Sequence, residues 1–205
     1  EDKVKTMKRH IMILTAALAL LINQQTARAQ FAGGSGTAED PWRVADAAQL
    51  DAVRTNLTAH FLQTADIDLG VVPWNQGAGW VPLGTSSTPF TGVYDGAGFA
   101  IRNLTIDRAG STYLGLFGYL SGATVRHVRL AGVAVHGAAY TGALAGYSSY
   151  AVIERVRING EVTGANYTGG ALGYMTYGAA GQIAMDGAVT GIDYTLYARF
   201  GGGYG

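Results

Sequence analysis

A repeat of 27 residues constrains the fold of this chain more than any other feature. Tyrosines recur at that step, as Tyr113, Tyr140, Tyr167 and Tyr194, and the first three open the similar segments YLGLFGYL, YTGALAGY and YTGGALGY. A second segment recurs within each period, from VRHVRLAGVAVHG to IERVRINGEVTG and AGQIAMDGAVTG. A fixed period of this size is typical of a solenoid, in which each repeat forms one coil and packs on its neighbours.

The order of residues within the repeat is typical of strands. Residues 128–130 read VRL, with an arginine between two apolar residues, and residues 156–158 and 183–185 repeat this alternation as VRI and IAM. Period two indicates β-strand, and the repeat has no apolar stretch of helical length. A coil of 27 residues predicts three strands of roughly 5 residues, with successive coils stacked ~4.8 Å apart. We therefore expect an all-β parallel β-helix (β-solenoid).

The N-terminus is typical of a secretory signal. Basic residues at 7–10 precede an apolar run at 11–22, and Ala27-Arg28-Ala29 provides a cleavage motif. The apolar run is too short to span a bilayer. Residues 1–29 are therefore interpreted as upstream residues followed by a signal peptide, Met7–Ala29, and the mature chain is expected to be exported without a transmembrane span.

Cleavage would leave a mildly acidic chain without lysine. Nine of the 14 basic residues remain, all of them arginine, and 12 of the 14 acidic residues remain, for a net charge of −3. This balance does not favour binding to nucleic acid or to an anionic membrane. The chain has no cysteine, so its stability must come from the stacked coils.

Three parts are expected in the mature chain. Residues 30–40 form a flexible polar lead-in, residues 41–95 form an N-terminal cap, and residues 96–205 carry the β-helix repeats. A cap is expected because the first coil of a solenoid exposes unpaired backbone groups. After Tyr194 the repeat loses register and no second cap is visible, so we expect further coils or a C-terminal domain beyond Gly205.

The cap is predicted to contain one short α-helix, from about Ala47 to Asn56. Asp46 and Gln49 have the spacing of a capping box, and the apolar residues that follow have helical spacing.

The order of segments resembles that of bacterial GLUG-repeat proteins. The segments that carry the resemblance are GGSGTAEDPW, VADAAQLDAVR, HFLQTADIDLG, FTGVYDGAGFAIRNLTI, GLFGYLSGATVRHVRL, TGALAGY and TGGALGY, between Gly33 and Gly191. This family includes exported adhesins related to filamentous haemagglutinin and the N-terminal part of some IgA-specific metallopeptidases. The resemblance implies a right-handed parallel β-helix at the cell surface and supplies no catalytic residues.

Two sets of residues are candidates for a ligand surface. The first is the column Tyr113, Tyr140, Tyr167 and Tyr194, beside a second column of Tyr119, Tyr147 and Tyr174. Stacked tyrosines can form a carbohydrate platform, but a structural ladder that fixes the register is favoured.

The second set is a basic strip of Arg129, Arg155 and Arg157. It can hold a sulfated or carboxylated glycan, although a solvated face is favoured, and Arg126 is expected to pair with Glu154.

The sequence contains no motif for catalysis or for a cofactor. Neither G-x-S-x-G nor H-E-x-x-H is present, and Asp66 and Asp68 share a strand face without the further acids that a Ca²⁺ site needs. We expect a non-catalytic surface module that contacts a host or matrix glycan or protein. A fragment of a carbohydrate-active β-helix enzyme and the stalk of a larger surface protease remain alternatives, because a β-helix alone does not decide function.

Overall fold

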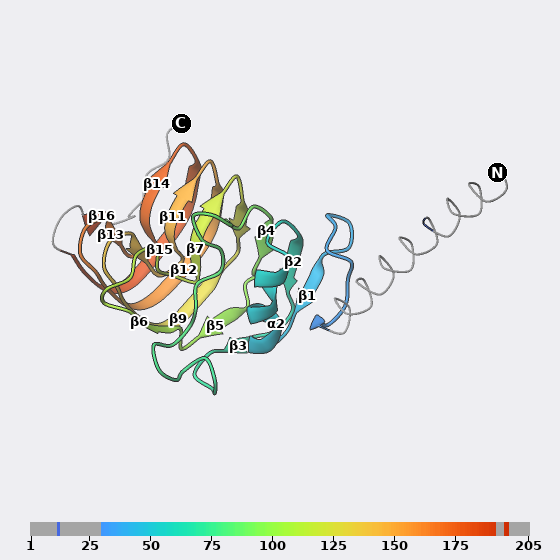
Figure 1. Cartoon of the computed structure of the whole chain (residues 1–205), viewed down its shortest axis with the longest axis horizontal. Helices are drawn as coiled ribbons and strands as arrows, with labels where there is room; N and C mark the ends of the chain where they lie inside the picture. Colours follow the sequence, from blue (N-terminus) through green and yellow to red (C-terminus); the bar gives the residue numbers. More distant parts are fainter. Residues whose placement is uncertain (1–11, 13–29, 192–194, 197–205) are drawn as a thin grey trace.

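The computed structural model describes Met12, residues 30–191 and residues 195–196 (Figure 1). Apart from Met12, the predicted signal segment lies outside the described residues, as does Tyr194. No helix among the described residues is long and apolar enough to cross a membrane.

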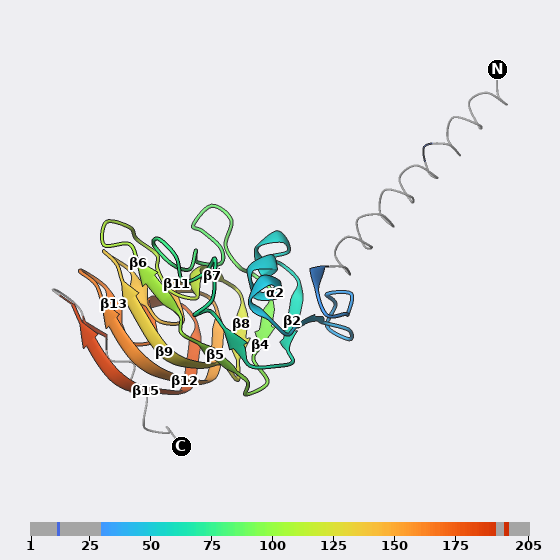
Figure 2. The same ribbon diagram turned by 90° about the horizontal axis from the view of Figure 1, so that it is seen from below.

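Parallel strands stacked in three sheets form a β-solenoid (Figures 1 and 2). The largest sheet contains β1 (Trp42–Val44), β2 (His60–Gln63), β3 (Ile67–Asp68), β4 (Val93–Asp95), β5 (Ala100–Arg102), β6 (Thr105–Asp107), β8 (Thr124–Arg126), β9 (Arg129–His136), β12 (Val152–Thr163) and β15 (Ala179–Thr190). The second contains β7 (Phe117–Ser121), β11 (Ala145–Ser149) and β14 (Leu172–Thr176), and the third contains β10 (Thr141–Gly142), β13 (Thr168–Gly169) and β16 (Thr195–Leu196). The predicted parallel β-helix is confirmed.

The 27-residue step is the register between neighbouring coils. Thr141 pairs with Thr168, and the same step relates β11 to β14 and β12 to β15 along their whole lengths. Between β9 and β12 the step changes from 28 to 27 at Gly132, an additional residue at a β-bulge with φ +69°. Glycine adopts this left-handed conformation without steric cost.

The three strands of a coil are unequal, whereas equal strands of roughly 5 residues were expected. In one coil they contain 2, 5 and 12 residues. The longest, β12, includes two straight segments on either side of Arg155, which has φ +54°. A single left-handed residue turns the strand, and its pairing to β15 continues in the same register on either side of Arg155, so one label covers two sides of the coil.

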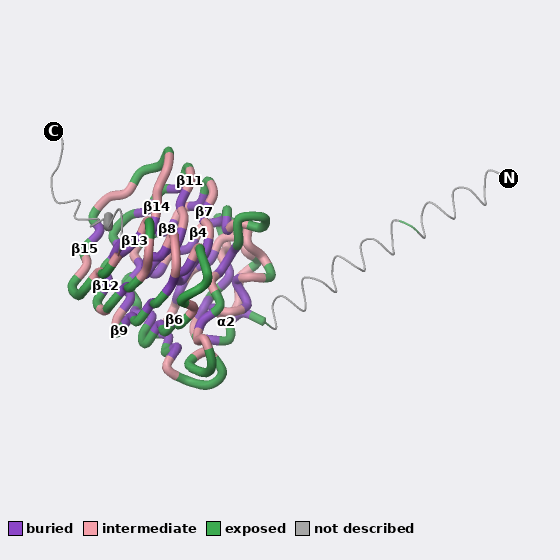
Figure 3. Tube along the Cα trace, turned by 60° about the vertical axis from the view of Figure 1, so that its left-hand side comes forward, coloured by how far each residue is buried: buried purple, intermediate pink, exposed green. Residues whose placement is uncertain are grey.

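The core is a column of apolar side chains inside the coils. Figure 3 shows the buried positions continuing from one coil to the next. The alternation seen in the sequence is confirmed, because Val128 and Leu130 are buried and Arg129 between them is exposed. An aromatic row from Phe61 through Phe90 to Phe117, with centroids 6.2 and 5.0 Å apart, fills the N-terminal coils.

Stacking begins before the visible repeat. Residues 42, 61, 94, 125 and 153 follow one another in a single line of parallel pairing, at sequence separations of 19, 33, 31, 28 and, to residue 180, 27. The segment predicted as a cap therefore contributes β1, β2 and β4 to the main sheet. Unequal connections hide this periodicity in the sequence.

The predicted short helix is present as α2 (Ala47–Ala52), continued by the 3₁₀ turn η1 (Val53–Thr55). Asp46 Oδ1 accepts a hydrogen bond from the Gln49 N–H at 2.8 Å, and Gln49 Oε1 accepts one from the Ala45 N–H at 2.7 Å. These bonds satisfy amides at the start of the helix, which lack intrahelical partners.

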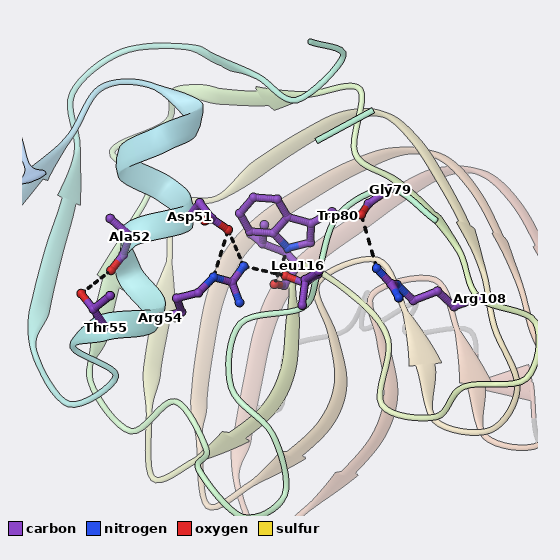
Figure 4. Close-up of polar contacts among 9 residues, drawn as sticks. Asp51, Ala52, Arg54, Thr55, Gly79, Trp80, Arg108 and Leu116 are labelled. Carbon is purple, nitrogen blue, oxygen red and sulfur yellow. Dashed lines mark hydrogen bonds and ion pairs between the residues drawn. The ribbon is translucent and has the colours of Figure 1, made fainter. Parts of the chain in front are cut away.

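Arg54 links the helix to the loop that precedes the repeat (Figure 4). Its guanidinium donates to Asp51 and to the carbonyl of Val81, and it lies 5.6 Å from the ring centroid of Trp80. Trp80 is fully buried and donates its Nε1–H to the carbonyl of Leu116. The helix is thereby attached to the first complete coils.

Candidate functional site: a basic groove across the coils

A groove of about 1230 Å³ crosses four successive coils where the main sheet bends. Gly98, Arg129, Arg157 and Ala184 line it, one from each coil, in the order in which the coils stack. Figure 2 shows β9, β12 and β15 curving side by side along this part of the solenoid. The groove therefore runs along the solenoid axis, and Arg129, Arg157 and Ala184 occupy equivalent positions in three of these coils.

The structure separates the two predicted sets of site residues. Arg129, Arg155 and Arg157 all line the groove, whereas the described tyrosines Tyr113, Tyr140 and Tyr167 do not. Tyr194 lies outside the described residues. The basic strip and the tyrosine column are therefore separate features of the surface.

A column of left-handed corner residues borders the groove. His127, Arg155 and Gln182 have φ values of +53°, +54° and +55°. Arg155 Nε donates to Gln182 Oε1 at 3.1 Å, and Arg155 Nη1 lies 3.0 Å from His127 Nε2. The side chain of Arg155 is thereby held along the column by one neutral group on either side.

These contacts assign the tautomer of His127. A guanidinium can only donate, so Nε2 of His127 must accept the hydrogen bond from Arg155. Nδ1 then carries the proton and donates to Asp95 Oδ1 at 3.0 Å. A neutral histidine therefore connects the carboxylate of Asp95 to the cation of Arg155.

Asp95 is the acidic anchor of this chain of hydrogen bonds. Its partial burial acts to raise its pKa, but hydrogen bonds from the Ala97 N–H, Arg126 and His127 together lower the pKa below its ordinary value. Arg126 Nε donates to Asp95 Oδ2 at 2.7 Å. The register aligns Arg126 with Glu154 as expected, but the predicted ion pair between them is wrong, because Arg126 binds Asp95 in the preceding coil instead.

Arg129 and Arg157 are cross-strand neighbours in adjacent coils, and both are exposed. Within the described part of the chain, neither makes an ion pair or a side-chain hydrogen bond. The nearby carboxylate of Asp66 is occupied, since hydrogen bonds from the Ala100 N–H and Arg102 lower its pKa. The charge of Arg129 also helps to lower the pKa of Asp66, so this carboxylate attracts Arg129 through space. The groove thus contains two like charges one coil apart, without a hydrogen-bonded counterion among the described residues.

The predicted tyrosine columns exist, and they pack against each other. Ring centroids of Tyr113, Tyr140 and Tyr167 are 4.9 and 4.8 Å apart, nearly parallel, and Tyr147 meets Tyr140 edge-on at 5.7 Å. Burial and the neighbouring tyrosines raise the pKa of Tyr140. Both faces of the Tyr140 ring are covered by tyrosines, which favours a structural ladder over a carbohydrate platform.

Glycines allow the tyrosine corners to approach the adjacent strands. A Cβ atom at Gly146 would lie 2.5 Å from the backbone of Tyr113, and one at Gly173 would lie 2.6 Å from the backbone of Tyr140. This close approach explains the glycine before the second tyrosine in GYS and GYM, whereas a Cβ atom at Gly118 of GYL would instead lie 2.5 Å from the carbonyl oxygen of Gly84.

A third tyrosine pair escaped prediction. Tyr150 and Tyr177 stack at 5.2 Å and are 64% and 74% exposed. Their separation of 27 residues could have predicted this pair. The preceding coil has Gly122 at the same corner, so the tyrosine does not recur in all three repeats.

The pair Asp66 and Asp68 has structural partners. Asp68 accepts hydrogen bonds from the Gly70 N–H and from Asn103, which lower its pKa. No group of three or more candidate metal ligands occurs among the described residues.

Comparison with known proteins places the chain among larger proteins. No family model matches it. It is 37% identical over 164 residues to a protein of Evansella cellulosilytica provisionally named Gly-rich membrane protein, an alignment that covers 73% of this chain and 19% of the relative. It is also 37% identical over 140 residues to halomucin of Haloquadratum walsbyi, covering 63% of this chain and 2% of halomucin. The chain therefore spans a fifth or less of the length of these relatives.

A solved structure shares the fold. The crystal structure of a protein from Bacteroides ovatus, provisionally described as an immunoglobulin A1 protease, superposes with a TM-score of 0.57 at 20% identity. The superposition covers 82% of this chain and 60% of that one. At this level of identity the similarity supports the β-solenoid architecture alone.

Proposed function

We propose that this chain is a non-catalytic β-solenoid module of an exported, GLUG-repeat-like surface protein, and that it binds ligands through its side rather than transforming them. The observation that carries the proposal is the groove across four coils, with arginines repeated at equivalent positions. A repeated surface of this kind is suited to an extended ligand, since each coil offers a similar contact.

The relatives are consistent with a surface location. One of the two is named as a membrane protein, and both are much longer than this chain. The signal peptide expected at Met7–Ala29 would direct the chain to export. An adhesin-like role, with a host or matrix glycan or protein as partner, follows from these features taken together.

The groove chemistry favours binding over catalysis. Two acids line the groove, Asp95 and Asp186, and the Asp95 carboxylate is held by three hydrogen bonds, from Ala97 and His127 to Oδ1 and from Arg126 to Oδ2. A general base must have a free lone pair directed at the substrate. Asp95 in this arrangement orients His127 instead of meeting a substrate.

The test compares binding with turnover. The full chain is incubated with immobilised extracellular glycans and matrix proteins, and the soluble phase is analysed for cleavage products. We expect saturable retention on at least one surface, without product formation. Steady release of oligosaccharides or peptides, abolished by Asp95→Asn, would instead establish the enzyme alternative.

A further inference from the structure

We propose that the groove binds an acidic polysaccharide, laid along the solenoid axis, with successive carboxylate or sulfate groups on Arg129 and Arg157 and a third on Arg155. This inference rests on the proposed function, since it takes the groove to be the binding face. It specifies the chemical class of the ligand and its direction.

The first argument is that the charges of Arg129 and Arg157 have no hydrogen-bonded carboxylate partner among the described residues. The two residues are paired in register on β9 and β12, one coil step of ~4.8 Å apart. Like charges at this separation destabilise a sheet, and among the described side chains Asp66, itself hydrogen-bonded to Arg102, offsets Arg129 only through space. Anionic groups bound to the two guanidinium groups would offset the repulsion and form charge-assisted hydrogen bonds.

The second argument is the orientation of Arg155. Only two of its five N–H donors are used within the described structure, by His127 and Gln182, and both acceptors are neutral. Its positive charge therefore remains available, while its side chain is already held in place. A prepositioned guanidinium loses less conformational freedom on binding an anion than a mobile one does.

The remaining acids define where the anions would lie. Asp95 at one end is paired with Arg126, and Asp186 lines the groove in the last described coil. Asp186 would repel a polyanion there, so the anionic groups are expected between Arg129 and Arg157. The amides of Asn159 and Gln182, which also line the groove, can bind sugar hydroxyls.

The spacing of the coils disfavours an extended acidic peptide. In an extended peptide, side chains on one face repeat every ~6.8 Å, which does not match a coil step of ~4.8 Å. Arginine also binds planar carboxylates and sulfates through paired N–H groups.

The experiment measures binding of the full chain to four polymers by titration calorimetry at low and high salt. Polyuronate carries carboxylates, heparin carries mainly sulfates, dextran is neutral, and poly-glutamate is an acidic peptide. We expect binding to polyuronate or heparin that weakens with salt, and none to dextran. The polymer that the chain binds with the higher affinity identifies the anionic group.

The decisive variants are Arg157→Gln and the double change Arg129→Gln/Arg157→Gln. We expect the double variant to lose roughly tenfold or more in affinity, the usual consequence of losing a hydrogen-bonded charge. The matched control is Arg43→Gln, an exposed arginine outside the groove, which should change affinity by less than about twofold. Unchanged melting temperatures would show that all three variants fold.

Several results would overturn the inference. They are failure of both acidic polysaccharides to bind, equal binding by the double variant, or tighter binding of poly-glutamate than of either polysaccharide. Retention of the chain on other surfaces in that case would leave the proposed surface function standing and reject only the acidic polysaccharide as its ligand.

Discussion

Non-glycine residues in left-handed conformation define the corners of this solenoid. Such a conformation costs an ordinary side chain roughly 1–2 kcal/mol. The structure shows what offsets this cost at two columns: rings stack at the Tyr113 corner, and hydrogen bonds join side chains at the Arg155 corner. At both corners, contacts between successive coils stabilise a backbone that is locally unfavourable.

Asp95 should contribute stability through its charge, and Asp95→Asn tests this. The variant loses the negative charge and replaces the Oδ2 acceptor of Arg126 with an NH2 group, while Oδ1 can still accept from His127, so we expect it to unfold about 1–3 kcal/mol more easily at pH 7. Urea unfolding monitored by circular dichroism measures the change. The matched control is Asp107→Asn, an exposed partner of His136, which should cost less than about 1 kcal/mol.

The same carboxylate predicts a pH dependence. The pKa of Asp95 is lower in the folded chain than in the unfolded chain, so its stabilising contribution is present above the ordinary value of about 3.9. That contribution is lost as the pH falls through the lower folded pKa. Unfolding titrations between neutral and acid pH should show a shallower loss for Asp95→Asn than for the unchanged chain. Parallel curves would contradict this assignment.

At the scale of the element, glycine sets how closely a corner and a strand can approach. Gly146→Ala would force a Cβ against the backbone of Tyr113, and backbone cannot move aside as a side-chain tip can. We expect a loss of roughly 1–3 kcal/mol in the free energy of unfolding. Gly181→Ala is the matched control on β15, where a Cβ meets nothing within 4 Å. Equal effects of the two changes would refute this explanation of the repeated glycine.

Much of each coil could be predicted because its signals are local. The alternation of Val128, Arg129 and Leu130 is a property of one strand, and the cap at Asp46 uses a residue three positions away. The ion pair of Arg126 could not be predicted in the same way. Its choice between Asp95 and Glu154 depends on side-chain geometry across two coil interfaces, which the register leaves open.

At the scale of the whole molecule, the sequence predicted the basic residues of the groove. It predicted neither the groove itself nor the unequal coils at the N-terminal end of the solenoid. The 33-residue separation between Phe61 and Tyr94, which pair in neighbouring coils, includes a long loop that hides the coil step in the sequence. The basic strip could be predicted from the sequence, because Arg129 and Arg157 recur at the same position of successive repeats. That the strip would line a groove could not be foreseen, because the groove depends on the bend of the main sheet at residues such as Arg155.

Because each coil packs on its neighbours at a fixed step of 27 residues, the outcome of two deletions can be predicted. Removing residues 140–166 deletes one register step and joins Ala139 to Tyr167, which takes the place of Tyr140. We expect a folded, cooperatively unfolding chain of lower stability. Removing residues 140–165 leaves one residue too many, which turns buried side chains outward. Its melting temperature should be lower than that of the first deletion by roughly 10 °C or more; equal values would show that loops absorb the change.

The direction of the backbone hydrogen bonds has a mechanical consequence. They link each coil to the next and therefore run along the solenoid axis, from β8 through β12 to β15. Tension along that axis loads one interface between coils at a time, so the chain should yield in steps instead of all at once. Each step would release 27 residues, on the order of 90 Å of extended chain. A surface protein built from such coils would lengthen under load and limit the force that reaches its bound ligand.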